Sequence, residues 1–299
     1  MPAPLPLSDD RYPSLRAHPC RYPDARDPHD RRPFLFHHGH LFPLTPADAP
    51  EPGAVLVEAD GDRLSLDRWL QQAGSPPIAA RIPVLAVGSN AYPRQLADKF
   101  HDHPLPDDAV PVLACTLTDL RLVFCAHLAQ HGYIPVTLRQ APGHTTHTWL
   151  QWLTAEQLET MAKTEGPYAL LAAVGAERWL RLDGIGQIPP RVLTWWHHAA
   201  LDLGPGLVAF AGNPSAGLPG DPDGLTETAL LHRVVAQWMH REGSSLAWDG
   251  CTVPADRHEL LRRFLHAHAC LNPPPPGWTE IDHQQPGFTA RVLADIRGE

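Results

Sequence analysis

A series of short strand-like segments between Ile82 and Val174 most constrains the fold of this 299-residue chain. Their apolar residues form short buried runs or alternate with polar residues, patterns that are typical of β-strands. The predicted strands cover Val84–Val87, Val110–Leu117, Asp119–Phe124, Ile134–Leu138, Thr145–Leu153 and Tyr168–Val174. Because few helices separate these strands and helices follow later, the order favours an α+β fold with a mainly antiparallel or mixed, barrel-like sheet.

The distribution of proline divides the chain into three parts. The chain has 34 prolines, roughly twice the usual share, and residues 1–80 are rich in them. We expect this part to be an extension that lies over a domain, with a strand at Val55–Ala59 and a short helix at Ser65–Gln72. Residues 81–176 form the predicted central domain, and residues 177–299 are a C-terminal elaboration of strands and helices.

Local signals place two helices in the central domain. Pro93 fits the first turn of a helix at Arg94–Phe100, because N–H groups in a first turn have no partner within the helix. Thr154 and Gln157 form a predicted capping box at the start of the second helix, and Gly166 ends it.

The C-terminal part has a different pattern. It contains a short predicted strand at Leu207–Phe210, a helix at Thr226–Arg241 with one apolar stripe, and a stiff proline-rich linker at Asn272–Gly277. A further helix opens with Asp256 and Glu259 as a predicted capping box. The apolar side chains that this last helix is expected to bury are Leu260, Leu261, Phe264 and Leu265.

Charge and composition exclude several classes of partner. The net charge of -9, without any run of five basic residues, gives no reason to expect nucleic acid. The longest nearly apolar run, Tyr168–Ala176, is too short to cross a bilayer, and the N-terminus lacks the pattern of a secretory signal. The 5 cysteines are sparse and form no Cys-x-x-Cys pair. We therefore expect reduced thiols, no membrane partner and a cytoplasmic location, whereas the oligomeric state stays open.

The stretch Gly88-Ser89-Asn90 is the first candidate site. It lies between a predicted strand and a predicted helix, where several backbone N–H groups have no partner. Glycine allows a ligand to approach the backbone closely, and Ser89 and Asn90 add polar side chains. Such a turn suits a carboxylate or a phosphate, although no known phosphate-loop motif is present. The alternative is an ordinary strand-to-helix turn with Asn90 as a cap.

Glu165 is the second candidate. It lies at the C-terminal end of the capped helix, where the helix dipole disfavours a negative charge. If Tyr168 and the next strand also shield it from water, its pKa should rise, which suits a general acid–base residue. The alternative is a solvated glutamate at a helix end.

The order of these motifs resembles that of the gamma-glutamylcyclotransferase-like superfamily. The resemblance covers residues 82–173 and includes the Gly-Ser-Asn loop, the helix that begins near Thr154, the pair Glu165-Gly166 and Tyr168. The segment 131–143 is also similar to the family's glycine-ended strand pair. Val87 and Ala91 depart from the family pattern, which has an aromatic residue and commonly a leucine at these places.

The resemblance implies an intramolecular reaction. The free α-amine of a gamma-glutamyl compound attacks its own γ-carbonyl, which closes a five-membered ring and releases 5-oxoproline and an amine. In this chain Gly88, Ser89 and Asn90 would hold the glutamyl end, with Tyr168 beside it, and Glu165 would move the proton. The resemblance implies no metal and no organic cofactor. A non-catalytic small-molecule-binding or interaction protein that keeps the fold is the alternative.

Other constellations have weaker sequence support. The 19 histidines include the groups 36–40, 101–103, 144–147 and 266–268, but none has the spacing of a zinc motif. We therefore predict no metal site, and a histidine-based metal hydrolase is a third function. A Gly-x-Ser-x-Gly motif is missing, and we expect Cys115 and Cys125 to be core residues.

Overall fold

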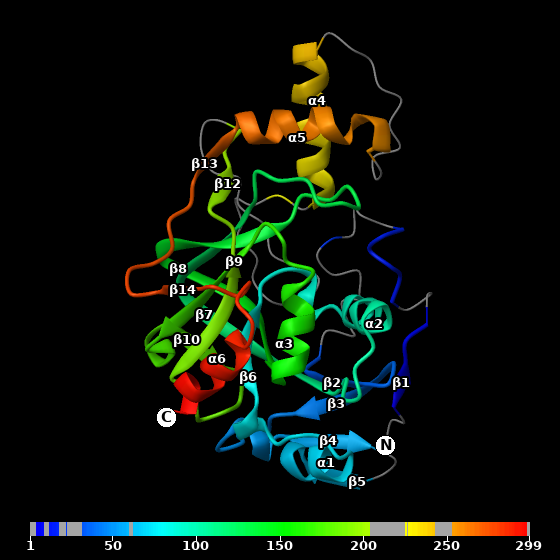
Figure 1. The fold of residues 1–299 in the computed structure, drawn as a ribbon, viewed down its shortest axis with the longest axis vertical. Helices are drawn as coiled ribbons and strands as arrows, with labels where there is room; N and C mark the ends of the chain where they lie inside the picture. The colour runs from blue at the N-terminus through cyan, green and yellow to red at the C-terminus, as the bar shows by residue number, and fades with distance from the viewer. Residues whose placement is uncertain are drawn as a thin grey trace.

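A twelve-stranded sheet forms the centre of the computed structural model, which describes residues 4–8, 12–17, 22, 32–59, 62–203, 225, 227–242 and 253–297 (Figure 1). Its strands are β1 (Leu5–Pro6), β2 (Phe34–His37), β3 (His40–Thr45), β4 (Leu56–Ala59), β5 (Asp62–Ser65), β6 (Ile82–Ala86), β7 (Val110–Phe124), β8 (Val136–Leu153), β9 (Ala169–Val174), β10 (Leu180–Leu182), β11 (Arg191–Trp196) and β14 (Thr279–Ile281). The strand order is β14-β9-β11-β6-β8-β7-β2-β3-β4-β5, with β1 paired to β3 and β10 paired to β7.

The structure confirms an α+β chain with a mixed sheet and corrects the predicted barrel. β6 pairs antiparallel with β8 and parallel with β11. The sheet does not close into a barrel, because strands from outside the predicted central domain pair with its outer strands and extend the sheet on both sides. β9 pairs with both β11 and β14, and β7 pairs with β2 as well as with β8. The sheet therefore ends at β14 and β5 and stays open.

Two pairs of predicted strands merge into single long strands. β7 includes both Val110–Leu117 and Asp119–Phe124, because a register shift between Thr118 and Leu120 absorbs the break. Asp119 has a positive φ of 61° at this bulge, and its carboxylate accepts the N–H of Gly143 at 2.7 Å. β8 likewise includes most of the strand predicted at 134–138 and all of the strand at 145–153.

The proline-rich part contributes strands to the same sheet. β2 pairs antiparallel with β7, with Phe36 opposite Val110. The predicted strand and short helix are confirmed as β4 and α1 (Leu66–Gln72), and the Ser65 side chain caps α1 by accepting the N–H of Arg68. Strands before residue 80 therefore pair with strands after it. In the same way β10 and β11, which follow residue 176, pair with β7 and β6, which precede it. The division into three parts remains a proposal about the sequence.

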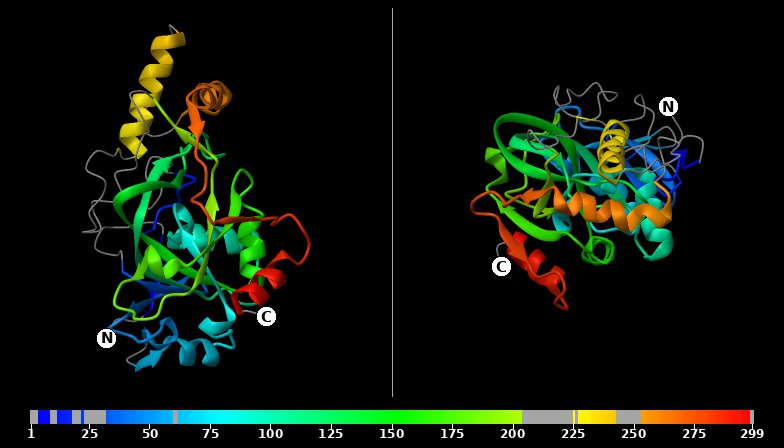
Figure 2. Two further views of the ribbon diagram at one scale, coloured as in Figure 1. Left: turned by 90° about the vertical axis from the view of Figure 1, so that its left-hand side faces the viewer. Right: turned by 90° about the horizontal axis from the view of Figure 1, so that it is seen from above.

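Helices surround the sheet. They are α2 (Pro93–Asp102), α3 (Ala155–Ala162), α4 (Glu227–Glu242), α5 (His258–Ala267) and α6 (Phe288–Arg297), with short 3₁₀ turns at Pro52–Ala54, Ile78–Ala80, Ser89–Ala91, Ala176–Arg178 and Ala255–Arg257. The capping box of α3 is confirmed, since Thr154 and Gln157 hydrogen-bond reciprocally. Figures 1 and 2 show α4 and α5 at one end of the molecule and α1 at the other. No helix in the described part of the chain is long and apolar enough to span a membrane.

The C-terminal part differs from three expectations. α5 lacks the predicted capping box, because Asp256 lies in a 3₁₀ turn, Arg257 is the N-cap residue and Glu259 binds Arg263 instead. Leu260 is exposed, whereas the other three apolar residues of this helix are buried. Residues 207–210 lie outside the described residues.

The predicted proline-rich linker begins at a buried residue. Asn272 is only 1% exposed, and its side-chain amide donates to the carbonyls of Leu138 and His197. It follows β13 (Ala269–Leu271), which pairs with β12 (Ala199–Leu201) in a small separate sheet. The start of the linker is therefore held by the core.

The buried side chain of Arg81 connects the central elements. Its guanidinium donates to the carbonyls of Pro76 (2.9 Å), Ala109 (2.8 Å) and Trp152 (3.3 Å), and to the side chains of Ser75, Asp107 and Gln157. These residues flank the starts of β7 and α3 and the end of β8, while Arg81 itself precedes β6. Burial lowers the pKa of Arg81 to about 10, so the group still carries its charge at neutral pH.

Replacing Arg81 should destabilise the protein strongly. We expect Arg81→Leu to lower the free energy of unfolding by about 3–5 kcal/mol, because the buried carbonyl groups of Pro76, Ala109 and Trp152 each lose a donor and Asp107 loses its ion-pair partner. Urea unfolding followed by circular dichroism measures this change. Arg63→Leu is the control, since Arg63 is 55% exposed and pairs with Glu58 at the surface, which costs less than about 1 kcal/mol. Equal losses in the two variants would contradict the assigned role of Arg81.

Candidate functional site

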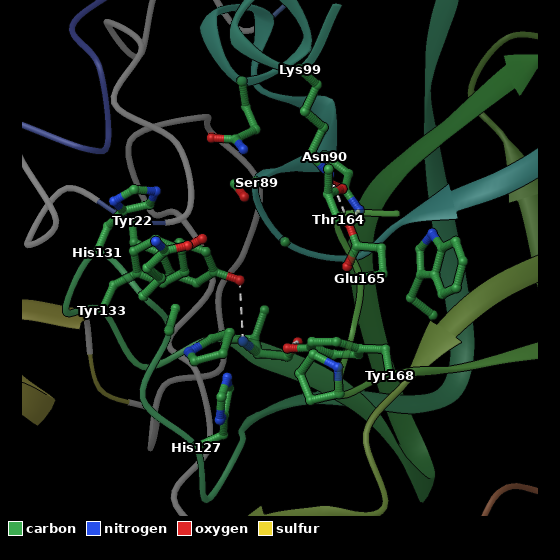
Figure 3. Close-up of a pocket in the computed structure, with 18 of the residues that line it drawn as sticks. Tyr22, Ser89, Asn90, Lys99, His127, His131, Tyr133, Thr164, Glu165 and Tyr168 are labelled. Atoms are coloured by element: carbon green, nitrogen blue, oxygen red, sulfur yellow. Dashed lines mark hydrogen bonds and ion pairs between the residues drawn. The ribbon is translucent and has the colours of Figure 1, made fainter. Parts of the chain in front are cut away.

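Gly88, Ser89, Asn90, Glu165 and Tyr168 line one cavity of about 590 Å³ (Figure 3). The first three residues follow β6 and lead through a 3₁₀ turn into α2. Glu165 follows the end of α3, and Tyr168 directly precedes β9. The structure therefore brings all five predicted site residues to one place, although their chemical roles remain predictions.

Glu165 is held by two polar side chains. Its Oε1 accepts hydrogen bonds from Nδ2 of Asn90 at 3.0 Å and from Nζ of Lys99 at 2.7 Å. Lys99 also donates to Oδ1 of Asn90 at 2.8 Å, which closes a triangle of three side chains (Figure 3). The side chains of Lys99 and Glu165 are only 5% and 11% exposed. Asn90 is thus a partner of the candidate acid–base residue, and Glu165 is not a freely solvated helix-end glutamate.

Sequence reasoning missed Lys99. It lies on α2 three residues after Leu96 and just before Phe100, and all three residues are buried. Residues three and four apart share a face of a helix, so a lysine at this position belongs to the apolar stripe. A charged residue on a buried stripe needs a partner, and this was the available signal.

Tyr22 forms the opposite wall and explains the glycine at position 88. Its hydroxyl oxygen accepts the N–H of Val136 at 3.1 Å, and its ring stacks on Tyr133 with centroids 4.4 Å apart (Figure 3). A Cβ atom at Gly88 would collide with this hydroxyl. Glycine is therefore required here by close approach. Tyr22 belongs to the proline-rich part, and no sequence signal marked it.

Tyr168 packs against its neighbours through its ring, and its hydroxyl makes only long contacts. The hydroxyl lies 3.5 Å from both Sγ of Cys125 and the carbonyl of Val136, and the ring packs edge-on against His197. Burial raises the pKa of Tyr168 well above its usual value, so the hydroxyl stays protonated. Burial also raises the pKa of Cys125 to about 12, which fits the predicted core residue and not a nucleophile.

Trp195 adds an unpartnered donor to the cavity lining. Its side chain is 3% exposed, and its indole N–H has no hydrogen-bond partner among the described residues. A buried donor without a partner costs roughly 1–3 kcal/mol.

The rim of the cavity carries basic side chains. Arg16, Lys163 and Arg262 belong to the lining, together with Asp102. Asp102 pairs with Arg16 at 2.5 Å, and this hydrogen bond lowers the pKa of Asp102 and raises that of Arg16. With Lys99 and Glu165 paired as well, and Arg262 lying 3.9 Å from Glu259, Lys163 is the remaining charged side chain of the lining, and its positive charge favours an anionic ligand.

Gly88→Ala tests the close approach of Tyr22. The added methyl should displace the Tyr22 hydroxyl and lower the free energy of unfolding by about 1–3 kcal/mol, measured by urea unfolding. Tyr22→Phe alone should cost about 1 kcal/mol, because Val136 loses a hydrogen-bond acceptor. The loss of unfolding free energy in the double variant Gly88→Ala/Tyr22→Phe should be smaller than the sum of the losses in the two single variants. Strictly additive losses would contradict the contact.

His127 makes the stability of this region depend on pH. It stacks near His197, and burial, followed by that neighbour, lowers the pKa of His127 to about 4. An unfolded histidine titrates near 6.5, so the unfolded state gains a proton first as the pH falls. The resulting loss of stability is absent above about pH 6.5, grows down to about pH 4 and reaches at most roughly 3 kcal/mol.

His127→Gln should remove this part of the pH dependence. Urea unfolding between pH 7 and about pH 4.5 measures the slope for wild type and variant. His144→Gln serves as the control, because His144 is exposed on β8. An unchanged slope in His127→Gln would contradict the assignment.

Comparisons with known proteins add little to this description. No protein-family model and no curated protein matches the chain. Among solved structures, a gamma-glutamyl cyclotransferase is similar with 12% identity and a TM-score of 0.31, over 73% of this chain and 99% of that protein. An uncharacterized protein from Homo sapiens is similar with 12% identity and a TM-score of 0.29, over 71% of this chain and 98% of that protein. Likeness at this level carries no argument about function.

Proposed function

We propose that the cavity binds a small gamma-glutamyl compound and catalyses its cyclisation to 5-oxoproline with release of an amine. The observation that carries this proposal is the convergence of Glu165, Asn90 and Lys99 beside the Gly88-Ser89 turn in one cavity. This arrangement offers a fixed carboxylate next to backbone groups and basic side chains that suit a glutamyl α-carboxylate.

Glu165 handles the proton in the proposed reaction. Both hydrogen bonds that it accepts from described residues end on Oε1, so Oε2 is available to a ligand. Oε2 takes a proton from the α-ammonium group of the substrate, and the freed nitrogen lone pair attacks the γ-carbonyl carbon. Glu165 returns this proton to the leaving nitrogen as the tetrahedral intermediate expels the amine, and the second proton of the attacking nitrogen passes to the released amine, so that the lactam keeps one N–H and the amine leaves as an ammonium ion.

The protein contributes mainly by holding a folded substrate. Because the nucleophile and the carbonyl belong to one molecule, correct positioning alone supplies a large share of the acceleration. Gly88 and Ser89 offer the backbone at the close turn. Lys99 and Asn90 hold the carboxylate of Glu165 in place as positioning residues.

Glu165→Gln is the decisive variant. In a 5-oxoproline release assay over a panel of gamma-glutamyl amino acids and amines, the change should lower kcat at least about 100-fold, because glutamine cannot accept the proton. Glu156→Gln is the matched control, since Glu156 is an exposed residue of α3 outside the cavity lining. The proposal is wrong if wild type releases no 5-oxoproline from any member or if Glu165→Gln is fully active.

The ion pair between Lys99 and Glu165 also supports a second candidate, a non-catalytic binding protein that keeps the fold. An acid that is already paired at 2.7 Å suits recognition of an ammonium group as well as proton transfer. Calorimetric binding of a gamma-glutamyl compound without any turnover by wild type would favour this function.

A further inference from the structure

The hairpin formed by β2 and β3 brings two consecutive histidines to one side. In a regular strand, neighbouring side chains point to opposite faces. His37 ends β2, but His38 has a positive φ of 48° and is followed by Gly39 with φ 70°. The turn therefore places the two rings together, with centroids 3.9 Å apart.

Asp108 joins these histidines from a distant part of the chain. Its Oδ1 lies 2.9 Å from Nδ1 of His37 and 3.3 Å from Nδ1 of His38. The backbone N–H of His38 also donates to both carboxylate oxygens. Pairing of Phe36 with Val110 in neighbouring strands keeps Asp108 at this place.

The spacing of the three donor atoms fits a small divalent cation. All three lie within 4.8 Å of one another, and this is the only such group of histidine, cysteine and acidic residues in the described part of the chain. Zinc binds nitrogen and oxygen ligands at about 2.0–2.2 Å, so tetrahedral ligand atoms lie roughly 3.3 Å apart. The separations of 2.9 and 3.3 Å are close to that value.

The cluster is accessible and lies outside the cavity. The side chain of His38 is 67% exposed, while those of His37 and Asp108 are 17% and 14% exposed, so an ion can enter beside His38. None of the three residues belongs to the cavity lining. The ring of Trp69 packs edge-on against His37 with centroids 5.3 Å apart, which limits the movement of this ligand.

We infer that His37, His38 and Asp108 form a Zn²⁺ site that joins the β2–β3 hairpin to the start of β7. The two imidazole nitrogens and the carboxylate supply three ligands, and water completes the coordination. Zinc would bind each imidazole through Nδ1, so that the proton of the neutral ring lies on Nε2. The site stabilises the fold and is independent of the proposed cyclisation.

The full-length protein, stripped with a chelator, tests this inference by calorimetric titration with zinc chloride alone. We expect one micromolar or tighter site, a rise in Tm of roughly 5 °C at saturating zinc, and the visible absorption of four-coordinate cobalt when Co²⁺ is used instead. Asp108→Asn and His38→Asn should each weaken zinc binding at least about tenfold. Asparagine tolerates the positive φ at residue 38, so this variant keeps the turn.

His101→Asn is the control, because His101 is an exposed histidine on α2 that belongs to no convergent group of described residues. It should keep the affinity and the Tm shift of wild type. Absence of a zinc site in wild type, or equal zinc affinity in His38→Asn and wild type, would overturn the inference. The contacts of His37 and His38 with Asp108 would then serve only to hold the turn, without binding a metal.

Discussion

The buried guanidinium of Arg81 is the interaction on which the central structure depends. It joins β6, the start of β7, the end of β8 and Gln157 in the first turn of α3. The two halves of the candidate site emerge from elements that this side chain connects. The Gly88 turn leaves the far end of β6, and Glu165 follows α3. A charge buried within the core thus connects the elements from which the turn and the carboxylate emerge.

Hydrogen bonds among Asn90, Lys99 and Glu165 hold the carboxylate beside the Gly88 turn. The lysine is almost fully buried, so its charge needs partners within the protein. Among the described residues, its ammonium group donates to Asn90 and Glu165. The hydrogen bonds that Glu165 accepts from these two partners both end on Oε1, which leaves Oε2 for the proposed ligand. The same geometry supports proton transfer or recognition of an ammonium group, and turnover distinguishes the two.

Local sequence signals predicted much of the fold and only part of the site. The Thr154–Gln157 capping box, Pro93 in the first turn of α2 and most central strands follow from nearest neighbours, and all are present. The barrel was wrong because strand pairing at the sheet edges is non-local. Tyr22 was missed for the same reason, since it acquires its role from a partner far along the chain, whereas the position of Lys99 on the apolar stripe of α2 was a local signal that did not identify Glu165 as its partner. The cluster of His37, His38 and Asp108 likewise needs a residue 70 positions from His38.

The stacking of Tyr22 on Tyr133 makes a residue of the proline-rich part into a wall of the cavity. Occupancy of the cavity and the attachment of that residue are therefore thermodynamically linked. A ligand that contacted the Tyr22 ring would favour its docked position, and the docked ring would in turn raise the affinity for that ligand by the same factor. Proteolytic cleavage or modification near the N-terminus would then act on affinity without touching Glu165.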